Sequence, residues 1–146
     1  ISEDSPEWKR FIQLATAKHI SHCFSTYGVV PNERMKTLYE KNDLIILPTL
    51  AEASTAVYPE SFVSKRVLLT SDIDFARELC GDAAIYFNPH DSKDITDKIL
   101  NIAFNQREKN LLISNGVRQL SISYLSPADK WQKQRDMILD IYRKIK

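Results

Sequence analysis

Three short apolar runs, each separated from the next by a helical segment, constrain the fold of this chain more than any other feature. They lie in the segments DLIILP (43–48), RVLLTSD (66–72) and AAIYFNP (83–89). A continuous apolar run of this length is typical of a strand covered on both faces, and strands that alternate with helices form parallel sheets. The sequence therefore predicts an α/β fold with a Rossmann-like parallel sheet and flanking helices, in which Leu44–Leu47 is a central, nearly inaccessible strand.

The first third of the chain predicts two helices with a strand between them. A serine and a proline at positions 5 and 6 open the first helix, and apolar residues at helical spacing from Trp8 to Ala15 predict one buried face. The segment CFSTYGVV (23–30) is rich in β-branched and aromatic residues, which predicts a strand. A second helix is expected at 32–40.

The last third of the chain predicts a helical C-terminal tail. Apolar side chains recur at helical spacing at 95–103, 112–120 and 131–145. Ser126 and Pro127 precede the third of these stripes as a cap and a first helical residue. Three successive helices are therefore expected after the last strand.

Composition and charge exclude several classes of function. The 146 residues include 20 basic and 19 acidic side chains, a formal net charge of +1, so no nucleic-acid partner is expected. No apolar run approaches the roughly 20 residues of a membrane-spanning helix and no leader-like segment opens the chain, which predicts a cytoplasmic protein. With only 3 glycines, the chain holds no glycine-rich phosphate loop.

Neither a metal site nor a disulfide framework is expected. Cys23 and Cys80 lie far apart and lack CxxC spacing, which disfavours both a zinc site and a disulfide pattern. His19, His22 and His90 share no spacing typical of metal ligands. The sequence therefore predicts that neither a metal nor another cofactor takes part in the function.

Two glutamates after the first apolar run are the main candidate functional residues. Glu52 and Glu60 are eight residues apart, and Pro59 disfavours one continuous helix through both, so a helix is expected to begin only close to that proline. The hydroxyls of Ser54 and Thr55, with backbone amides at the helix N-terminus, suit a phosphate flanked by sugar hydroxyls. The structural alternative is that Ser54 or Thr55 caps the helix and Glu60 interacts with its dipole.

Two further pairs of charged residues also have a functional and a structural interpretation. Asp72 and Asp74 could form a carboxylate pair, or Asp74 could cap the helix that follows. Lys65 and Arg66 could contact a phosphate, or they could complement the dipole at a solvated helix end.

The segment that carries the two glutamates resembles a known family. AEASTAVYPES (51–61) is similar to the E-x7-E segment of retaining GT-B glycosyltransferases of the large family-four group, the glycosyl transferases group 1. The resemblance also includes LIILPT, the Ser71-Asp72 end of the next strand, and Glu78, and it covers about residues 24 to 90. It implies the C-terminal, donor-binding domain of an enzyme that transfers a sugar from a nucleoside-diphosphate sugar to an acceptor hydroxyl.

The resemblance also implies roles for individual residues. Glu60 matches the carboxylate that accepts hydrogen bonds from the ribose hydroxyls of the donor nucleotide. Glu52 matches the catalytic carboxylate beside the donor sugar, where charge develops at the anomeric carbon. The backbone amides of Ser54, Thr55 and Ala56 would face the diphosphate and stabilise it as a leaving group.

Further implications concern what lies outside this chain. In the family, the domain begins with two strands that are not in this sequence, of which the first carries basic residues that clamp the diphosphate, and an N-terminal domain binds the acceptor. Residues 1–146 are therefore expected to be one partial domain of a longer two-domain protein, inactive as an isolated fragment. The expected partners are a nucleotide-sugar donor and that N-terminal domain, without a metal. Hexosyl transfer in polysaccharide biosynthesis and a peripheral membrane association are expected only of the full-length protein.

A non-catalytic alternative stays open. A Rossmann-like module could bind a nucleotide or another protein without catalysing a reaction. The family commonly has glycines at positions that are held here by Ala53, Thr55, Lys65 and the pair Asp74-Phe75. Their replacement favours a transferase that has lost its activity.

Overall fold

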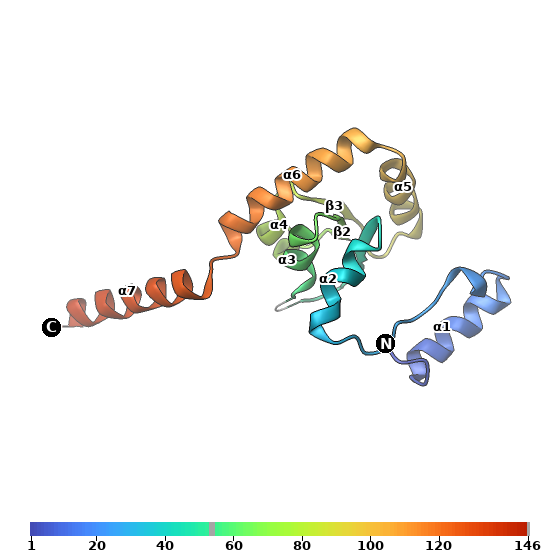
Figure 1. Cartoon of the computed structure of the whole chain (residues 1–146), viewed down its shortest axis with the longest axis horizontal. Coiled ribbons are helices and arrows are strands. Elements are labelled where there is room, and N and C mark those ends of the chain that lie inside the picture. The colour runs from blue at the N-terminus through green and yellow to red at the C-terminus, as the bar shows by residue number, and fades with distance from the viewer. Residues whose placement is uncertain (53–54, 146) are drawn as a thin grey trace. The chain divides into compact units, whose positions relative to one another are not determined.

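The computed structural model describes residues 1–52 and 55–145 (Figure 1). Ser54, one of the candidate donor-binding residues, lies outside the described residues. The chain divides into two compact units, Ile1–Leu38 and Tyr39–Lys146, and each is considered by itself. The expectation of one partial domain within a longer protein stays a prediction.

The larger unit contains a three-stranded parallel sheet with the order β1-β2-β3. The strands are β1 (Leu44–Leu47), β2 (Val67–Ser71) and β3 (Ala84–Phe87). The helices of this unit are α3 (Val57–Val63), α4 (Asp74–Cys80), α5 (Ser92–Ala103), α6 (Gln106–Ser123) and α7 (Pro127–Ile145). The unit begins with the last two residues of α2 (Asn32–Glu40). The predicted α/β class, the parallel sheet and the helical tail are thus confirmed.

The central strand is β2, and β1 lies at the edge of the sheet. All five side chains of β2 are buried, whereas Ile46 in β1 is 41% exposed. The prediction that Leu44–Leu47 is a central, nearly inaccessible strand was therefore wrong. An apolar run indicates that a strand is covered, but not how many neighbours it has, and among the described strands β1 pairs with β2 alone.

The core consists of two apolar clusters, one on each face of the sheet. On the first face, Tyr58 and Phe62 of α3 pack with Leu68 of β2 and Cys80 of α4. The residues of the second face are Val67, Leu69, Phe87, Ile102 and Leu112, which come from the sheet and from α5 and α6. Successive residues of β2 point to opposite faces, so one strand contributes to both clusters.

Helix α6 contacts α3, α4 and α5, and a glycine lies at its contact with α3. A Cβ atom at Gly116 would lie 2.7 Å from Cδ1 of Phe62, a buried ring of α3. Cβ atoms do not occur at such distances in folded proteins, so the two helices can approach this closely only because position 116 has no side chain.

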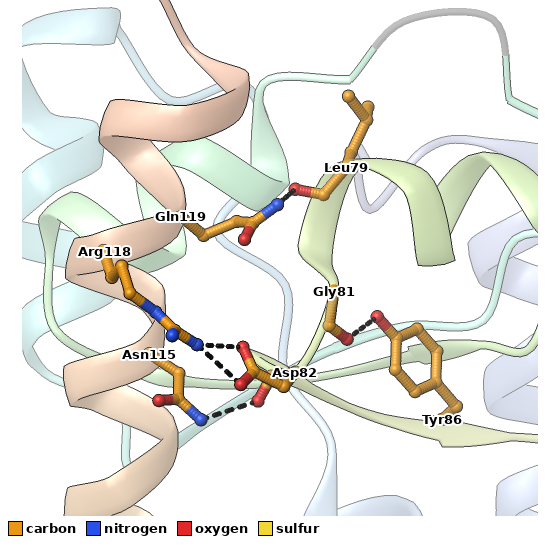
Figure 2. Close-up of polar contacts among 7 residues, drawn as sticks. All are labelled: Leu79, Gly81, Asp82, Tyr86, Asn115, Arg118 and Gln119. Carbon is orange, nitrogen blue, oxygen red and sulfur yellow. Dashed lines mark hydrogen bonds and ion pairs between the residues drawn. The ribbon is translucent and has the colours of Figure 1, made fainter.

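Polar side chains of α6 also hold the turn between α4 and β3 (Figure 2). The guanidinium of Arg118 donates to both carboxylate oxygens of Asp82, at 2.8 and 2.6 Å, and Asn115 Nδ2 donates to the Asp82 carbonyl at 3.0 Å. Gln119 Nε2 donates to the Leu79 carbonyl at 3.1 Å. Within the turn Gly81 has a φ of +53°, a conformation that favours glycine.

The helix α3 ends in a left-handed residue that is not a glycine. Lys65 has a φ of +54°, its amide donates to the Phe62 carbonyl, and the amide of Arg66 donates to the Ser61 carbonyl. This pattern is the Schellman motif, in which the left-handed position is usually a glycine. Position 65 therefore has a backbone conformation that favours glycine, although its side chain is a lysine.

The smaller unit contains α1 (Pro6–Ala17), the short 3-10 helix η1 (Ser21–Cys23) and most of α2. Ser5 caps α1 by accepting from the amide of Trp8, as its position predicts. Ala15 is buried, but Phe11 is 41% exposed although its ring contacts the rings of Trp8 and Phe24. The predicted buried face of this helix is therefore only partly formed within the described chain.

The predicted strand at 23–30 was wrong. Residues 21–23 form η1, and 24–30 pair with no strand among the described residues. Gly28 has a φ of +63°, and its amide donates to Thr26 Oγ1 in a local turn. β-branched and aromatic residues favour a strand only where a neighbouring strand completes the ladder, and this segment has none.

The last helix, α7, begins as predicted and buries none of its described side chains. Ser126 Oγ accepts from the amide of Asp129 at 3.1 Å, which confirms the predicted cap. Trp131, Ile138 and Tyr142 are each more than half exposed. The sequence determines where α7 starts, but no other element of the described chain buries the apolar stripe of this helix.

We expect Gly116→Ala to destabilise the fold. The helix propensity of alanine exceeds that of glycine by about 1 kcal/mol, whereas overpacking a core contact costs about 1–3 kcal/mol. A net loss of about 1 kcal/mol should appear as a lower urea midpoint for the variant. Ser114→Ala, at an exposed position of the same helix, should leave the midpoint unchanged or raise it. An unchanged midpoint for Gly116→Ala would contradict the close packing of α6 on α3.

We expect Lys65→Gly to stabilise the protein. A glycine adopts a positive φ without the penalty of a Cβ atom, about 1–2 kcal/mol for other residues, although it adds backbone entropy to the unfolded chain. The net gain should be about 0.5–1 kcal/mol in urea unfolding. Lys65→Ala is the matched control, since it removes the charge but keeps the Cβ atom. Equal gains for both variants would mean that the charge, and not the backbone conformation, is responsible.

Candidate functional site

The two candidate carboxylates lie on different elements at the carboxyl edge of the sheet. Glu52 is in the segment that follows β1, and Glu60 is in the first turn of α3. Both residues are half-buried. The helix begins at Val57, so Pro59 lies in its first turn, as predicted. The structure thus excludes the arrangement in which both glutamates lie along one face of a continuous helix.

The start of α3 shows a local hydrogen bond of Thr55, but Thr55 is not the N-cap residue that the structural alternative predicted. Thr55 Oγ1 accepts a hydrogen bond from the amide of Val57 at 3.1 Å. Ala56 is the N-cap residue and is exposed, and its side chain makes no capping bond. The hydroxyl of Thr55 therefore has a structural role, and the amide of Val57 already has a partner at this helix end.

The carboxylate of Glu60 interacts with a buried tyrosine. Tyr39, the penultimate residue of α2, is 7% exposed. Burial raises the pKa of its hydroxyl, and a hydrogen bond to the Glu60 carboxylate raises that pKa further. Because the tyrosine stays protonated at neutral pH, it donates this hydrogen bond and gives the Glu60 carboxylate a fixed neighbour.

Arg66 joins the end of α2 to the strand that follows α3. Its Nε donates to the Tyr39 carbonyl at 3.3 Å, and its Nη2 donates to the Glu40 carbonyl at 2.6 Å. Both carbonyls belong to the last turn of α2, where a cation complements the helix dipole. These contacts support the structural interpretation of Arg66, in which it complements a helix dipole. The same hydrogen bonds hold Tyr39 beside Glu60.

A buried hydroxyl pair joins α3 to β2. Tyr58 and Thr70 are both fully buried, and their hydroxyl oxygens are 3.1 Å apart. Thr70 Oγ1 also donates to the Leu47 carbonyl at 3.2 Å. Burial raises the pKa of Tyr58, and the negative charge of Glu52 contributes in the same direction.

Asp72 pairs with an arginine instead of with Asp74. Arg77 Nε donates to Asp72 Oδ1 at 2.5 Å and Nη2 donates to Oδ2 at 2.8 Å. These hydrogen bonds lower the pKa of Asp72. The guanidinium also lies 4.3 Å from the centre of the Tyr86 ring. Asp74 lies in the first turn of α4 without capping it, since Ile73 is the N-cap residue.

The structure gives no support, within the described residues, for a reactive thiol, a metal site or a membrane-spanning helix. Burial raises the pKa of the Cys80 thiol to about 12, so it is not an activated nucleophile. Within the described ranges, no three His, Cys, Asp or Glu side chains lie together as metal ligands, and the absence of a metal stays a prediction. No helix in the described part of the chain is long and apolar enough to cross a membrane.

The sequence did not identify Tyr39, Tyr58 and Thr70 as candidate site residues. Each has the apolar spacing or strand position of a core residue, and only the fold shows that its hydroxyl contacts a polar partner. Tyr39 and Glu60 are 21 residues apart in the sequence, and Tyr58 and Thr70 are 12 apart. The one local signal was that a tyrosine and a threonine occupy positions that a purely apolar core would give to other residues.

We expect Thr55→Val to destabilise α3 while keeping its shape. Valine has the size of threonine but cannot accept the hydrogen bond from the Val57 amide, and loss of one such hydrogen bond costs about 0.5–1.5 kcal/mol. Urea unfolding should show a loss of about 1 kcal/mol, whereas Thr55→Ser should keep most of the stability. Equal stability of the valine variant and the native protein would mean that this hydrogen bond does not stabilise the start of α3.

The fold is shared with a solved glycosyltransferase. The chain superimposes on sucrose-phosphate synthase from Thermosynechococcus elongatus with a TM-score of 0.76 at 15% sequence identity. The match covers 99% of this chain and 35% of that protein, so the chain spans about a third of its length. No curated protein matches this sequence significantly. The likeness confirms the Rossmann-like fold of a GT-B C-terminal domain.

A family comparison connects the sequence itself to the same group of enzymes. The sequence model described as "Glycosyl transferases group 1" matches residues 2–119. This range contains the sheet, both glutamates and most of α6, and it extends beyond residues 24–90, on which the resemblance rested. The chain belongs to the glycosyl transferases group 1 family.

Proposed function

We propose that this chain is the donor-binding part of a retaining glycosyltransferase. The enzyme would transfer a hexosyl group from a nucleoside-diphosphate sugar to an acceptor hydroxyl. The observation that carries the proposal is the placement of Glu52 and Glu60, two half-buried carboxylates on separate elements at the carboxyl edge of a parallel sheet. Ligands of open α/β folds bind at this edge.

Glu60 is proposed to bind the ribose of the donor. A carboxylate has about four lone-pair sites, so after accepting from Tyr39 it can still accept from two neighbouring ribose hydroxyls. The contact with Tyr39 also reduces the number of rotamers that Glu60 samples before the donor binds, which lowers the entropy lost on binding. The same contact is thus compatible with donor binding and favours it.

Glu52 is proposed to act beside the donor sugar. In a retaining transfer the bond between the anomeric carbon and the phosphate oxygen breaks, and the acceptor oxygen forms a new bond to the same face of that carbon. The departing phosphate takes the proton of the acceptor hydroxyl. A carboxylate beside the anomeric carbon stabilises the positive charge that develops there. The amides of Thr55 and Ala56, at the start of α3, are proposed to face the diphosphate.

The remaining parts of the proposal concern the full-length protein. We propose that the acceptor site and the basic clamp for the diphosphate lie outside these 146 residues, so the isolated chain would not catalyse transfer. A metal-independent mechanism, a cytoplasmic location, peripheral association with a membrane and a role in polysaccharide biosynthesis stay predictions. The replaced glycines favour the non-catalytic alternative, but Lys65 keeps the backbone conformation of a glycine at its position.

The first test is donor binding by the full-length protein that contains this chain. Calorimetric titration with UDP-, GDP- and ADP-linked glucose should show saturable binding to one donor. Glu60→Ala should weaken that binding at least about tenfold, since hydrogen bonds to a charged group contribute about 1.5–3 kcal/mol. Glu33→Ala removes a carboxylate from the first turn of α2 and is the matched control, with an expected affinity equal to the native value.

Two outcomes would contradict the proposal. If the folded protein binds none of the three donors, the non-catalytic alternative is favoured and capture of a protein partner becomes the next experiment. If a donor binds but Glu60→Ala and Glu33→Ala have equal affinities, the donor does not occupy the site described here.

A further inference from the structure

A buried chain of hydrogen bonds connects the two elements that carry the glutamates. The hydroxyl of Thr70 in β2 donates to the carbonyl of Leu47, the last residue of β1. Because a hydroxyl has one hydrogen, the second bond of Thr70 must be accepted from the hydroxyl of Tyr58 in α3. The chain therefore runs from Tyr58 through Thr70 to the Leu47 carbonyl, with both side chains fully buried.

The two ends of this chain enclose the segment that carries Glu52. Leu47 lies five residues before Glu52, and Tyr58 lies two residues before Glu60 on the same helix. The hydrogen bonds thus join the point where the chain leaves β1 to the point where α3 begins.

The hydroxyl of Tyr58 is not needed to fill the core. The ring of Tyr58 packs in the first apolar cluster with Phe62 and Leu68 and contacts Phe75, and a phenylalanine ring would fill the same space. Thr70 would keep its bond to the Leu47 carbonyl without Tyr58. What the tyrosine hydroxyl adds is a directional link between α3 and the ends of β1 and β2, because hydrogen bonds depend on angle and apolar contacts do not.

We propose that Tyr58 is a positioning residue that, through Thr70 and Leu47, sets the separation of Glu52 and Glu60 for a ligand that contacts both. This inference rests on the proposed function, since it assumes that a nucleotide sugar spans the two carboxylates. The nucleotide part contacts Glu60 and the start of α3, and these move together with Tyr58. Only the sugar part depends on where Glu52 lies relative to α3.

The consequence is a selective effect on the complete donor. Without the Tyr58 hydroxyl, Glu52 and Glu60 hold their native separation for a smaller fraction of the time, so a ligand that bridges them loses affinity. A nucleoside diphosphate without the sugar contacts only the α3 side and keeps its affinity. A merely structural role would weaken the binding of both ligands by the same factor.

The test compares Tyr58→Phe with Tyr86→Phe in the full-length protein. Tyr86 donates to the Gly81 carbonyl at 2.6 Å in the turn before β3, so this control also loses one hydroxyl-to-carbonyl link, but one that joins neither β1 nor α3. Titrations use UDP-, GDP- and ADP-glucose, and UDP, GDP and ADP. For the nucleotide sugar that the native protein binds, Tyr58→Phe should raise the Kd about three- to tenfold. For the nucleoside diphosphate with the same base, it should change the Kd less than about twofold. Tyr86→Phe should change neither.

Substitutions at Thr70 give an independent measurement of the same link. Thr70→Val removes the hydroxyl that Tyr58 contacts and should reproduce the selective loss, whereas Thr70→Ser keeps the hydroxyl and should restore native affinity for the nucleotide sugar. Rescue by serine would support a role for the hydrogen bond itself. Equal selective losses for valine and serine would contradict it.

The outcomes separate this inference from the proposed function. Equal weakening of nucleotide sugar and diphosphate by Tyr58→Phe would overturn the positioning role, as would native affinity for both. In either case the loss of donor binding in Glu60→Ala would leave the proposed function standing. If the native protein binds no nucleotide sugar, the proposed function fails and the positioning role fails with it.

Discussion

The complete burial of β2 is the constraint on which the rest of the structure depends. Leu68 belongs to one apolar cluster and Val67 and Leu69 belong to the other, and the backbone of β2 pairs with β1 on one side and β3 on the other. A strand in this position must be parallel to both neighbours for the helical crossovers to cover the two faces. The segments that follow β1 and β2 therefore emerge at the same edge, where Thr70 reaches the Leu47 carbonyl and the helix α3 begins.

The packing of α6 shows which of its contacts matter most for stability. Both side chains of the Arg118–Asp82 ion pair are solvent-exposed, and exposed pairs of this kind contribute about 0–1 kcal/mol to the free energy of unfolding. The contact of Gly116 with Phe62 lies in the core, where even one added methyl group has no space. Apolar close packing therefore attaches α6, and its polar residues fix the conformation of the turn before β3 (Figure 2).

The candidate site combines two glutamates with buried hydroxyls of the core. The chain belongs to the glycosyl transferases group 1, and the resemblance of its E-x7-E segment to that family is the basis of the roles proposed for the two glutamates. The hydroxyl of Tyr39, which contacts Glu60, and the hydroxyls of Tyr58 and Thr70 were identified only by the fold of this chain. Each is buried with a polar partner, so each restricts the orientation of the group it contacts. A site with such support is organised before a ligand binds, which lowers the entropy cost of binding.

Much of the fold could be predicted from the sequence because its causes are local. Apolar runs and helical spacing determined the class, the three strands, the tail and the start of α3 near Pro59. The spacing of Glu52 and Glu60 located the candidate site. The sequence could not show that β1 is an edge strand, or that 24–30 has no strand partner, since both depend on which elements lie beside them. Only the tertiary structure decided which hydroxyls meet Glu60 and the end of β1, because those contacts join residues that are distant in the chain and adjacent only after packing.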